Sequence, residues 1–427
     1  MKFHSTRKST PSISFSESLL MGLAPDGGLL IPDHFPDFSQ SDMAQLALAS
    51  FQDIAKMIAK SFTEDDLLHN KIDKICDEAF NFPVPLKILR NDTAFLELYH
   101  GPTCAFKDIG ARFLASAISQ LQSEKKQSLT VLVATSGDTG SAVASAFYKK
   151  PFVDVIVLYP HGKISPRQEI QLTCWGENIE SFAVQGDFDD CQRMVKQAFL
   201  DPWWKTNKNL ISANSISVGR ILPQTFYYAW ASLKYFNETG NKPGFIIPSG
   251  NLGNATACLW AKKMGFPFRE VVMSTNANHS VLDYALTGVF HPHATLTTLA
   301  NAMDVGNPSN IERILDFSPD HQEFKNEVKV LSVNDRQIKD TIQNGQKNWG
   351  EVFCPHTATA VFVREQLKTP HWIIVATAHP AKFESIVEPL ICRTVRIPKA
   401  LEQILDRPTF KKIIPADLES LKQELAD

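Results

Sequence analysis

The stretch LTVLVATSGDTGSAVASAFYKKPFVDVIVLYP, residues 129–160, carries the pattern on which the fold depends. It begins with the continuous apolar, β-branched run LTVLVAT, which is typical of a strand buried on both faces. A helical segment through GSAVASAFYKK follows, and a second apolar run, VDVIVLYP, ends the stretch. A strand, a helix and a strand at this spacing predict a βαβ unit and a parallel sheet.

The same alternation continues on both sides of this stretch. A candidate strand at 94–99 and a helix at 108–122 precede it, and helices alternate with strands after it as far as REVVMST. The alternation resumes with the strand HWIIVATAHP and the helix AKFESIVEPLI, whereas residues 278–350 are predicted to be polar and irregular. We therefore expect an α/β protein in which residues 96–215 and 216–427 form two lobes with a cleft between them.

The first 95 residues lack this rhythm, so residues 1–95 are expected to form a separate, mostly helical domain. SFSESLL is predicted to be a short helix that precedes a Gly-rich turn. Apolar residues recur at helical spacing in DMAQLALASFQDIAKMIAKSF, residues 42–62, and again over residues 64–80. Each of these two segments is predicted to be a helix.

Composition excludes several classes of protein. A chain of 427 residues is too long for one small core, and its net charge of −3 offers no basic surface for nucleic acid. Seven cysteines without a C-x-x-C pair argue against a disulfide framework and against a cysteine zinc site, and they favour a reducing compartment. No apolar run is long enough to span a membrane, and MKFHSTRKSTPSISF lacks the apolar core of a signal peptide. We expect a cytoplasmic protein with no membrane partner, no nucleic-acid partner and no metal.

Three loops follow predicted strands and precede predicted helices, where ligands of open α/β sheets bind, and the third of them is VATAHPAKF, residues 375–383. The first, ATSGDTGSA, places Ser136, Gly137, Asp138 and Thr139 at a helix N-terminus, where backbone N–H groups and the helix dipole favour an anion. An ordinary capped helix would look the same.

The second loop, IPSGNLGNATA, contains the five residues Gly250, Asn251, Leu252, Gly253 and Asn254. Its small residues allow backbone amides to approach a phosphate. It matches neither G-x-G-x-x-G nor a Walker loop, so one compact phosphate group fits better than a nucleotide. The alternative is a Gly-rich turn that merely joins strand to helix.

A lysine suggests what these loops hold. Lys107 follows Phe106 in HGPTCAFKD, where a loop becomes a helix, and Thr377 follows the buried strand of VATAHPAKF. Alone, Lys107 would be a solvated charge and Thr377 a local cap. Together with a phosphate loop, they favour pyridoxal phosphate (PLP), which needs a lysine amine, a phosphate cup and a partner for its ring nitrogen. A helix N-terminus and partial desolvation would favour the neutral amine.

Several motifs resemble a known family. They are FHSTR, DGGLLIP, HGPTCAFKD, ATSGDTGSAVA, LYPHGKISPRQ, SANSISVGRI, IPSGNLGN, NAMDVGNPSN and TAHPAKF, and they cover essentially the whole chain. In this order they resemble the threonine synthase family, in its bacterial and fungal branch with an N-terminal domain. The resemblance implies PLP fold type II, as in the tryptophan synthase β-subunit, with open, mainly parallel sheets and helices on both faces.

The resemblance also implies a reaction, in which O-phospho-L-homoserine and water give L-threonine and phosphate through γ-elimination and β-hydration. It implies that Lys107 binds PLP and moves protons. Phe106 would flank the cofactor, residues 250–254 would bind its phosphate, and Thr377 would face the ring nitrogen. The substrate carboxylate would bind at Ser136–Thr139. The remaining substrate-side candidates, chiefly for its phosphate, are Lys163, Asn214, Ser215 and Arg220. The protein would act as a monomer or homodimer.

Two positions depart from the family pattern GNFGD. Leu252 replaces Phe and still offers a backbone N–H, and Asn254 replaces Asp and removes a negative charge beside a phosphate dianion. Cys104 occupies a variable position of the lysine motif and receives no role. Three other functions stay open on the residues alone: a PLP phospho-lyase that releases 2-oxobutyrate, a serine or threonine dehydratase, and a non-catalytic binding protein.

Overall fold

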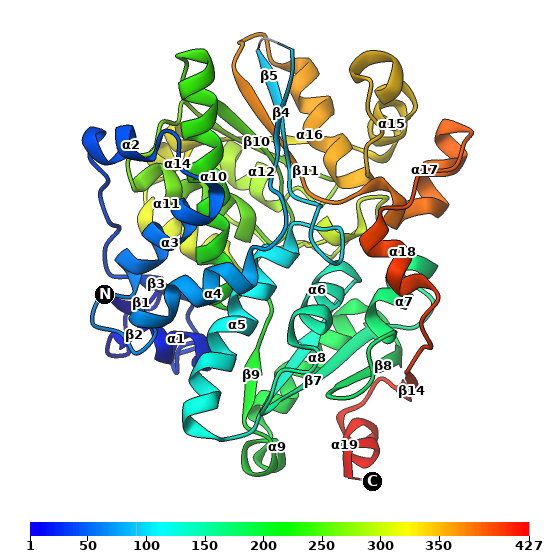
Figure 1. The fold of residues 1–427 in the computed structure, drawn as a ribbon. Helices are drawn as coiled ribbons and strands as arrows, with labels where there is room; N and C mark the ends of the chain where they lie inside the picture. The colour runs from blue at the N-terminus through cyan, green and yellow to red at the C-terminus, as the bar shows by residue number, and fades with distance from the viewer. Residues whose placement is uncertain (91, 427) are drawn as a thin grey trace.

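The computed structural model describes residues 1–90 and 92–426 and contains two large sheets surrounded by helices (Figure 1). One sheet lies in the upper part of Figure 1, the other at the lower right, and the N-terminal elements lie at the left. The upper sheet has six strands in the order β12 (Val328–Ser332), β11 (Val271–Thr275), β10 (Gly244–Pro248), β13 (Trp372–Ala376), β5 (Thr93–Glu97) and β4 (Leu86–Arg90). Within it, only the pairing of β4 with β5 is antiparallel among the described strands.

The second sheet is parallel throughout its described pairs. Its order is β14 (Lys412–Pro415), β8 (Ile179–Gln185), β7 (Val153–Pro160), β6 (Leu129–Ala134) and β9 (Leu210–Ser212). Every residue of β6 is buried. The apolar run that opens the 129–160 stretch therefore forms the fully buried parallel strand that its composition predicts, and α6 (Asp138–Phe147) connects it to β7.

The sheets are assembled from segments that are distant in sequence. β5 begins at Thr93 and pairs with β13, and the C-terminal strand β14 returns to β8. Sheet membership thus crosses the expected boundaries at residues 95/96 and 215/216. The expected boundaries assumed that each sheet uses strands from one continuous part of the chain. The edge strand of a sheet has unpaired backbone groups, so a strand from a distant part of the chain can also pair with it.

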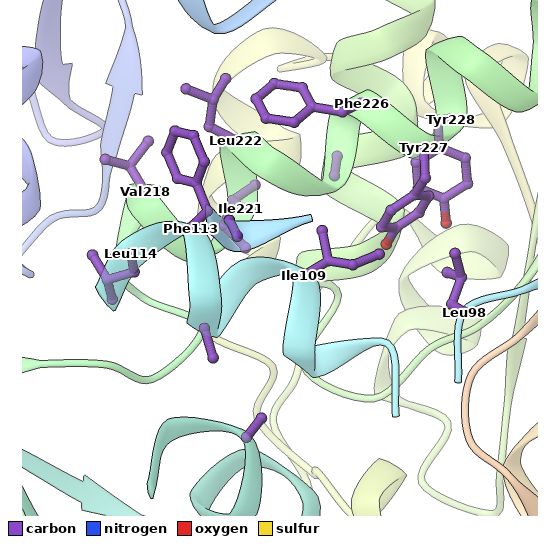
Figure 2. Close-up of a cluster of buried hydrophobic side chains, with 14 of the residues drawn as sticks. Leu98, Ile109, Phe113, Leu114, Val218, Ile221, Leu222, Phe226, Tyr227 and Tyr228 are labelled. Atoms are coloured by element: carbon purple, nitrogen blue, oxygen red, sulfur yellow. The ribbon is translucent and has the colours of Figure 1, made fainter. Parts of the chain in front are cut away.

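Two long helices, α5 (Lys107–Lys125) and α10 (Val218–Thr239), pack against each other beside the sheets. Figure 2 shows Ile109, Phe113 and Leu114 of α5 near Ile221 and the other apolar side chains of α10. Burial of such side chains stabilises the fold by about 1.5–3 kcal/mol each relative to exposure. The contact holds the first turns of both helices close together.

In the described part of the chain, eight further helices connect the strands of the two large sheets or cover them. They are α7 (Pro166–Thr173), α8 (Phe188–Leu200), α9 (Pro202–Asn207), α11 (Gly253–Lys263), α16 (Pro355–Gln366), α17 (Glu384–Ile391), α18 (Lys399–Leu405) and α19 (Leu418–Ala426). Among the residues that the structure describes, no helix combines the length and apolar character needed to cross a membrane.

The N-terminal segment is mostly helical but differs in detail from prediction. The helix expected at 42–62 is two helices, α2 (Gln40–Leu46) and α3 (Phe51–Phe62), because Ser50 caps α3 in a capping box with Asp53. Over residues 64–80, only a 3₁₀ turn, His69–Lys71, and α4 (Ile72–Ala79) are helical.

This segment also contains a small sheet that we did not predict. It has the order β2 (Ile13–Ser14), β1 (Lys2–Ser5), β3 (Leu30–Pro32) and is antiparallel, and α1 (Phe15–Met21) follows β2. Such short strands carry too few residues to show a period-two pattern in the sequence.

The expectation that residues 278–350 are irregular is wrong. This region contains α12 (Ser280–Thr287), α13 (Ile311–Phe317), α14 (His321–Glu327), β12 and α15 (Asp335–Trp349). In α15 only one narrow face, including Ile338 and Ile342, is buried, and polar residues fill the rest. A helix of this kind has low overall hydrophobicity, which conceals its period in the sequence.

Candidate active site

A cavity of about 210 Å³ lies where β6, β10 and β13 end and α5, α6 and α11 begin. Most of the residues that the sequence singled out line it: Phe106, Lys107, Ser136, Asp138, Thr139, Asn214, Ser215, Arg220, Gly250, Asn251, Leu252, Gly253, Asn254 and Thr377. Gly137, the N-cap of α6, lies between two lining residues without lining the cavity itself. Residues from all three predicted loops therefore meet in one place.

Lys107 is the first residue of α5, and its amine is in an environment that disfavours positive charge. Burial lowers the pKa of Lys107 to about 8. Asp138 opposes this shift, whereas the cations Arg220 and Lys382 add to it. The amine also lies 5.8 Å from the centre of the Phe106 ring. A substantial fraction of the amine is therefore neutral near pH 8, as a nucleophilic amine requires.

The loop before Lys107 is held by hydrogen bonds at both ends. Thr103 donates its backbone N–H and its hydroxyl to the carboxylate of Asp108, at 2.9 and 2.7 Å. Phe106 donates its backbone N–H to the carbonyl oxygen of Thr377, at 2.8 Å. A Cβ at Gly101 would lie 2.5 Å from the Asp108 carboxylate, so glycine is required there. These contacts place Lys107 beside the end of β13.

Residues 250–254 form a cradle at the N-terminus of α11. Leu252, the N-cap residue, adopts a left-handed conformation with φ of 62°. A Cβ at Gly250 would lie 2.6 Å from the Cα of Met303, and one at Gly253 would lie 2.7 Å from Ile221. Glycine therefore lets the backbone come close, and the N–H groups of the first helical turn have no partners within the helix. Such a cradle suits a phosphate group.

Asn254 adds a side-chain donor to this cradle. Its Oδ1 accepts hydrogen bonds from the hydroxyls of Tyr227 and Tyr228, at 2.5 and 2.7 Å. Its buried Nδ2 has no partner within the described part of the chain. An unpaired amide donor that lines the cavity favours an anion, so the replacement of Asp by Asn at this position suits phosphate binding.

Asn251 and Ser215 support the cradle. Asn251 donates to the Ser215 hydroxyl at 2.5 Å and accepts from the backbone N–H of Ser309 at 2.6 Å. Asn310 donates to the carbonyl oxygens of Asn251 and Ser215, at 2.9 and 3.2 Å, and Arg313 donates to the Asn310 side chain at 2.6 Å. The side chains of Asn251 and Ser215 are thus engaged in shaping the loop.

Thr377 provides an unpaired hydroxyl at the end of β13. The residue is buried, lines the cavity, and its Oγ1 has no hydrogen-bond partner among the described residues. Its backbone N–H already donates to the Thr357 hydroxyl at 3.2 Å, so the hydroxyl of Thr377 is the group left for a ligand. An orphaned hydroxyl, an orphaned amide donor and a glycine cradle around one lysine fit PLP, whose phosphate and ring nitrogen both need partners.

A buried ion pair, which we did not predict, lies next to Lys107. The amine of Lys382 is fully buried, 3.0 Å from a carboxylate oxygen of Asp138 and 2.6 Å from the carbonyl oxygen of Thr103. Gln168 donates to the same Asp138 oxygen at 3.1 Å. Burial alone would raise the pKa of Asp138, but Lys382 and then Lys107 lower it by more. Asp138 is therefore ionised, and its side chain cannot hold a substrate carboxylate.

Ser136 and Thr139 remain available on this loop. Both are partly exposed to the cavity at the N-terminus of α6. The backbone N–H groups of Gly137 and Gly140 already donate to the Thr135 hydroxyl, at 3.0 and 2.9 Å. The hydroxyls of Ser136 and Thr139 and the other N–H groups of the first turn can therefore serve an anion. Lys382 lies in the motif TAHPAKF, on the 3₁₀ turn Pro380–Phe383 that follows β13, and nothing local in the sequence indicates its partner Asp138.

Arg220 is a buried cation that forms no ion pair within the described part of the chain, although the charge of Asp108 partly opposes the effect of burial on its pKa. It is 3% exposed, and its guanidinium donates to the carbonyl oxygen of Ala213. Its Nε has no partner, and no described carboxylate lies within ion-pair distance. Burial lowers the pKa of Arg220 to about 10, so the group stays charged at neutral pH. A buried guanidinium that lines a cavity and lacks a carboxylate favours an anionic ligand.

The structure does not bring Lys163 to the cavity. Lys163 is exposed after β7 and lies outside the lining residues. Asn214 does line the cavity. Its Nδ2 donates to the carbonyl oxygen of Ala134 at 3.4 Å, and its buried Oδ1 has no hydrogen-bond partner among the residues that the structure describes. Among the predicted substrate-side residues, Arg220 is therefore the one cation that lines the cavity.

Two further groups were missed. His356 lines the cavity, accepts the backbone N–H of Ala302 at 3.1 Å, and has a pKa that burial lowers to about 4. Asp304 also lines the cavity, and burial raises its pKa to about 6 although Thr298 and Asn276 donate to it. Neither residue lies in one of the three loops that follow a predicted strand, so the alternation of strands and helices in the sequence does not identify them as site residues.

Comparison with known proteins agrees with this geometry over the full chain. Three family models match in succession: threonine synthase N terminus over residues 2–80, pyridoxal-phosphate dependent enzyme over 89–376, and threonine synthase, C-terminal, over 357–424. The threonine synthase of Escherichia coli K12 is 38% identical over 425 residues, 99% of each chain.

Solved structures are similar over the same extent. The crystal structure of the Escherichia coli threonine synthase has a TM-score of 0.91 at 37% identity and covers 100% of this chain and 99% of that one. A PLP-bound threonine synthase from Brucella melitensis has a TM-score of 0.94 at 29% identity, covering 100% and 98%. The similarity includes both sheets and the N-terminal segment.

Proposed function

Because this chain belongs to the threonine synthase family of PLP-dependent lyases, we propose that it converts O-phospho-L-homoserine and water to L-threonine and phosphate. One observation carries the choice of substrate. Two features of the cavity suit a phosphate group: the cradle at 250–254 and the guanidinium of Arg220, which forms no ion pair with a described residue. The cofactor supplies one phosphate, so a second buried cation suits a substrate that carries another.

Each cofactor contact in this proposal rests on a group that has no other partner. Lys107 would bind PLP covalently, the backbone of residues 250–254 with the Asn254 amide would hold its phosphate, and the Thr377 hydroxyl would face its ring nitrogen. When bound, PLP withdraws electrons from the bonds around the α-carbon of an attached amino acid. A neutral threonine, rather than a carboxylate, at the ring nitrogen would moderate that withdrawal.

The chain's own groups would then move protons and hold charges. The Lys107 amine, released when the substrate amine takes its place, would remove the α-proton as a general base. The N-terminus of α6 with Ser136 and Thr139 would orient the substrate carboxylate. Arg220 would hold the γ-phosphate and stabilise the charge that develops as its bond to carbon breaks. Departure of the γ-phosphate would also require removal of a proton from the β-carbon. A proton would then be added at the γ-carbon and the hydroxyl group of water at the β-carbon, and Lys107 would return a proton to the α-carbon.

Replacement of Arg220 tests the substrate assignment. Arg220→Leu retains much of the apolar stem but removes the charge and all five donors, which costs about 1.5 to 3 kcal/mol for a charge-assisted contact. We expect kcat/KM for O-phosphohomoserine to fall by roughly one to two decades. Slow elimination from serine or threonine, and PLP occupancy, should change little because those substrates carry no phosphate.

Threonine and free phosphate should be assayed together. Phosphate with 2-oxobutyrate instead of threonine would identify a phospho-lyase. No loss on any substrate would indicate a dehydratase, in which Arg220 is dispensable. Equal losses on phosphorylated and unphosphorylated substrates would indicate a folding defect or a contact of Arg220 with the substrate carboxylate. Absence of covalently bound cofactor would indicate a binding protein. We further place the enzyme in the cytoplasm, which the seven free cysteines support.

A further inference from the structure

Two histidines and one aspartate form a second chemically distinctive group outside the cavity. His279 precedes α12, Asp283 lies one turn further along it, and His293 comes from the loop after that helix. The two imidazoles each contact the same carboxylate oxygen of Asp283 at 2.8 Å, through Nδ1 of His279 and Nε2 of His293. We name these three residues the His279–Asp283–His293 cluster.

We propose that this cluster is a binding site for a divalent transition metal of the zinc type, which ties the loop at the rim of the active-site cavity to α12. The three donor atoms all lie within 4.8 Å of one another. Tetrahedral coordination with bonds of about 2.0–2.1 Å places neighbouring donors about 3.3 Å apart. Each contact with Asp283 is thus within about half an ångström of that spacing.

The donor set selects the class of metal. Two imidazole nitrogens and one carboxylate oxygen are ligands that Zn²⁺ prefers, whereas Ca²⁺ and Mg²⁺ require sets of oxygen atoms. His279 and His293 are 46% and 44% exposed, so an ion reaches them from solvent and water completes the coordination. We predicted no metal from the sequence, because the third ligand is ten residues from the second and lies on an irregular loop.

The loop that carries His293 reaches the active site. The backbone N–H of His293 donates to the carbonyl oxygen of Gly306 at 3.1 Å, and Gly306 and Thr295 both line the cavity. Packing is tight here, since a Cβ at Gly306 would lie 2.1 Å from the carbonyl oxygen of His293. A metal bridging His293 to α12 would therefore restrain this part of the cavity wall.

A second contact positions the same loop beside α12. Asn278, immediately before His279, accepts from the backbone N–H of Leu296 at 2.8 Å and donates to the carbonyl oxygen of Leu296 at 2.9 Å. These bonds hold the loop near the helix without metal. The cluster is thus largely preorganised, and metal binding would reinforce an arrangement that already exists.

The first test is Zn²⁺ titration of the PLP-loaded protein by calorimetry in phosphate-free buffer. We expect one equivalent to bind. Affinity should fall more than about tenfold in each of His279→Ala, Asp283→Asn and His293→Ala, since loss of even an outer-shell partner costs about 10–100-fold. His291→Ala is the matched control, because His291 is an exposed histidine two residues from His293 on the same loop, and it should bind Zn²⁺ like the parent.

Two results of this titration would overturn the site. One is the absence of a stoichiometric equivalent in the parent protein, which would leave the cluster as a hydrogen-bonded His–Asp–His group only. The other is an equal loss in His291→Ala, which would mean diffuse binding to surface histidines.

The second test concerns the loop. At Zn²⁺ about 100 times above its Kd, hydrogen exchange of peptides covering 289–300 should slow by up to about 100-fold in the parent protein, because the metal binds only the closed arrangement. His293→Ala should show no such slowing. Stoichiometric binding without slower exchange would overturn the restraint of the loop.

Discussion

At the scale of single residues, Lys107 illustrates how position changes chemistry. A lysine in solvent has a pKa near 10.5, whereas burial beside Arg220 and Lys382 lowers that of Lys107 to about 8. The sequence motif indicated the direction of this shift, because a helix N-terminus and partial desolvation both disfavour the ammonium form. It could not indicate Lys382, which is 275 residues away in the chain.

The lowered pKa predicts the pH dependence of cofactor incorporation. Below pH 8 each unit reduces the neutral fraction of Lys107 about tenfold, so the rate at which PLP binds covalently to cofactor-free protein should rise up to pH 8 and then level off. The increase in absorbance of the bound cofactor measures this rate. Butylamine with PLP is the control and should keep accelerating above pH 9. The Lys107→Ala variant should form no covalent adduct with PLP. The assignment would be contradicted if the rate for the protein followed the pH dependence of butylamine. It would also be contradicted if borohydride reduction placed the pyridoxyl label on another lysine.

The buried pair of Lys382 and Asp138 makes a separate prediction. Lys382→Met leaves the Asp138 carboxylate ionised and buried without its counter-charge, which should lower the free energy of unfolding by about 3–5 kcal/mol. Urea unfolding measures the loss. The double variant Lys382→Met/Asp138→Asn should regain much of it, because no unpaired charge remains. If the single and double variants unfold alike, the pair contributes through packing rather than charge.

At the scale of elements, the junction of β10 with α11 depends on small residues. Gly253→Asp would push a Cβ against Ile221 and place a carboxylate where the cradle faces an anion. We expect strong loss of PLP on dialysis, measured as cofactor absorbance per mole of protein. Gly253→Ala has the same Cβ without the charge and should retain more cofactor. Full occupancy of the Asp variant after dialysis would refute the cradle.

Elements also show where sequence patterns fail. The continuous apolar runs at β6, β7 and β10 predict their strands because burial on both faces needs apolar residues throughout. The helix α15 is buried along one face only, and its polar majority hid it within an expected irregular zone. The hydrophobic pattern of a segment therefore identifies a helix or strand more clearly when more of its surface is buried.

At the scale of the whole molecule, the C-terminal segment completes the sheet built by residues 129–212. Ile414 on β14 is 2% exposed in a cluster with Phe182 and Leu421, whereas its neighbour Ile413 is 52% exposed. Ile414→Ala should therefore lower the free energy of unfolding by about 2–5 kcal/mol, and Ile413→Ala should have little effect. Urea unfolding followed by tryptophan fluorescence compares the two. Equal effects would mean that the returning strand does not stabilise this sheet.

The sequence by itself determined the α/β class, the three strand-end loops and the lysine, because each follows from local requirements: apolar runs for buried strands, glycines for close backbone approach, and small or polar residues at helix starts. Most predicted site residues meet in one cavity for that reason, since parallel strands present their carboxyl ends at the same edge.

Only the tertiary structure decided which side chains face one another. It paired Lys382 with Asp138 and placed Lys163 outside the cavity. It also left one atom of each of three cavity-lining residues without a hydrogen-bond partner among the described residues: Arg220 Nε, Asn254 Nδ2 and Thr377 Oγ1. It also returned β14 to the opposite sheet and brought His293 to α12. These contacts join residues tens to hundreds of positions apart in the chain or on irregular loops. They depend on how whole elements pack, and no local period or propensity encodes them.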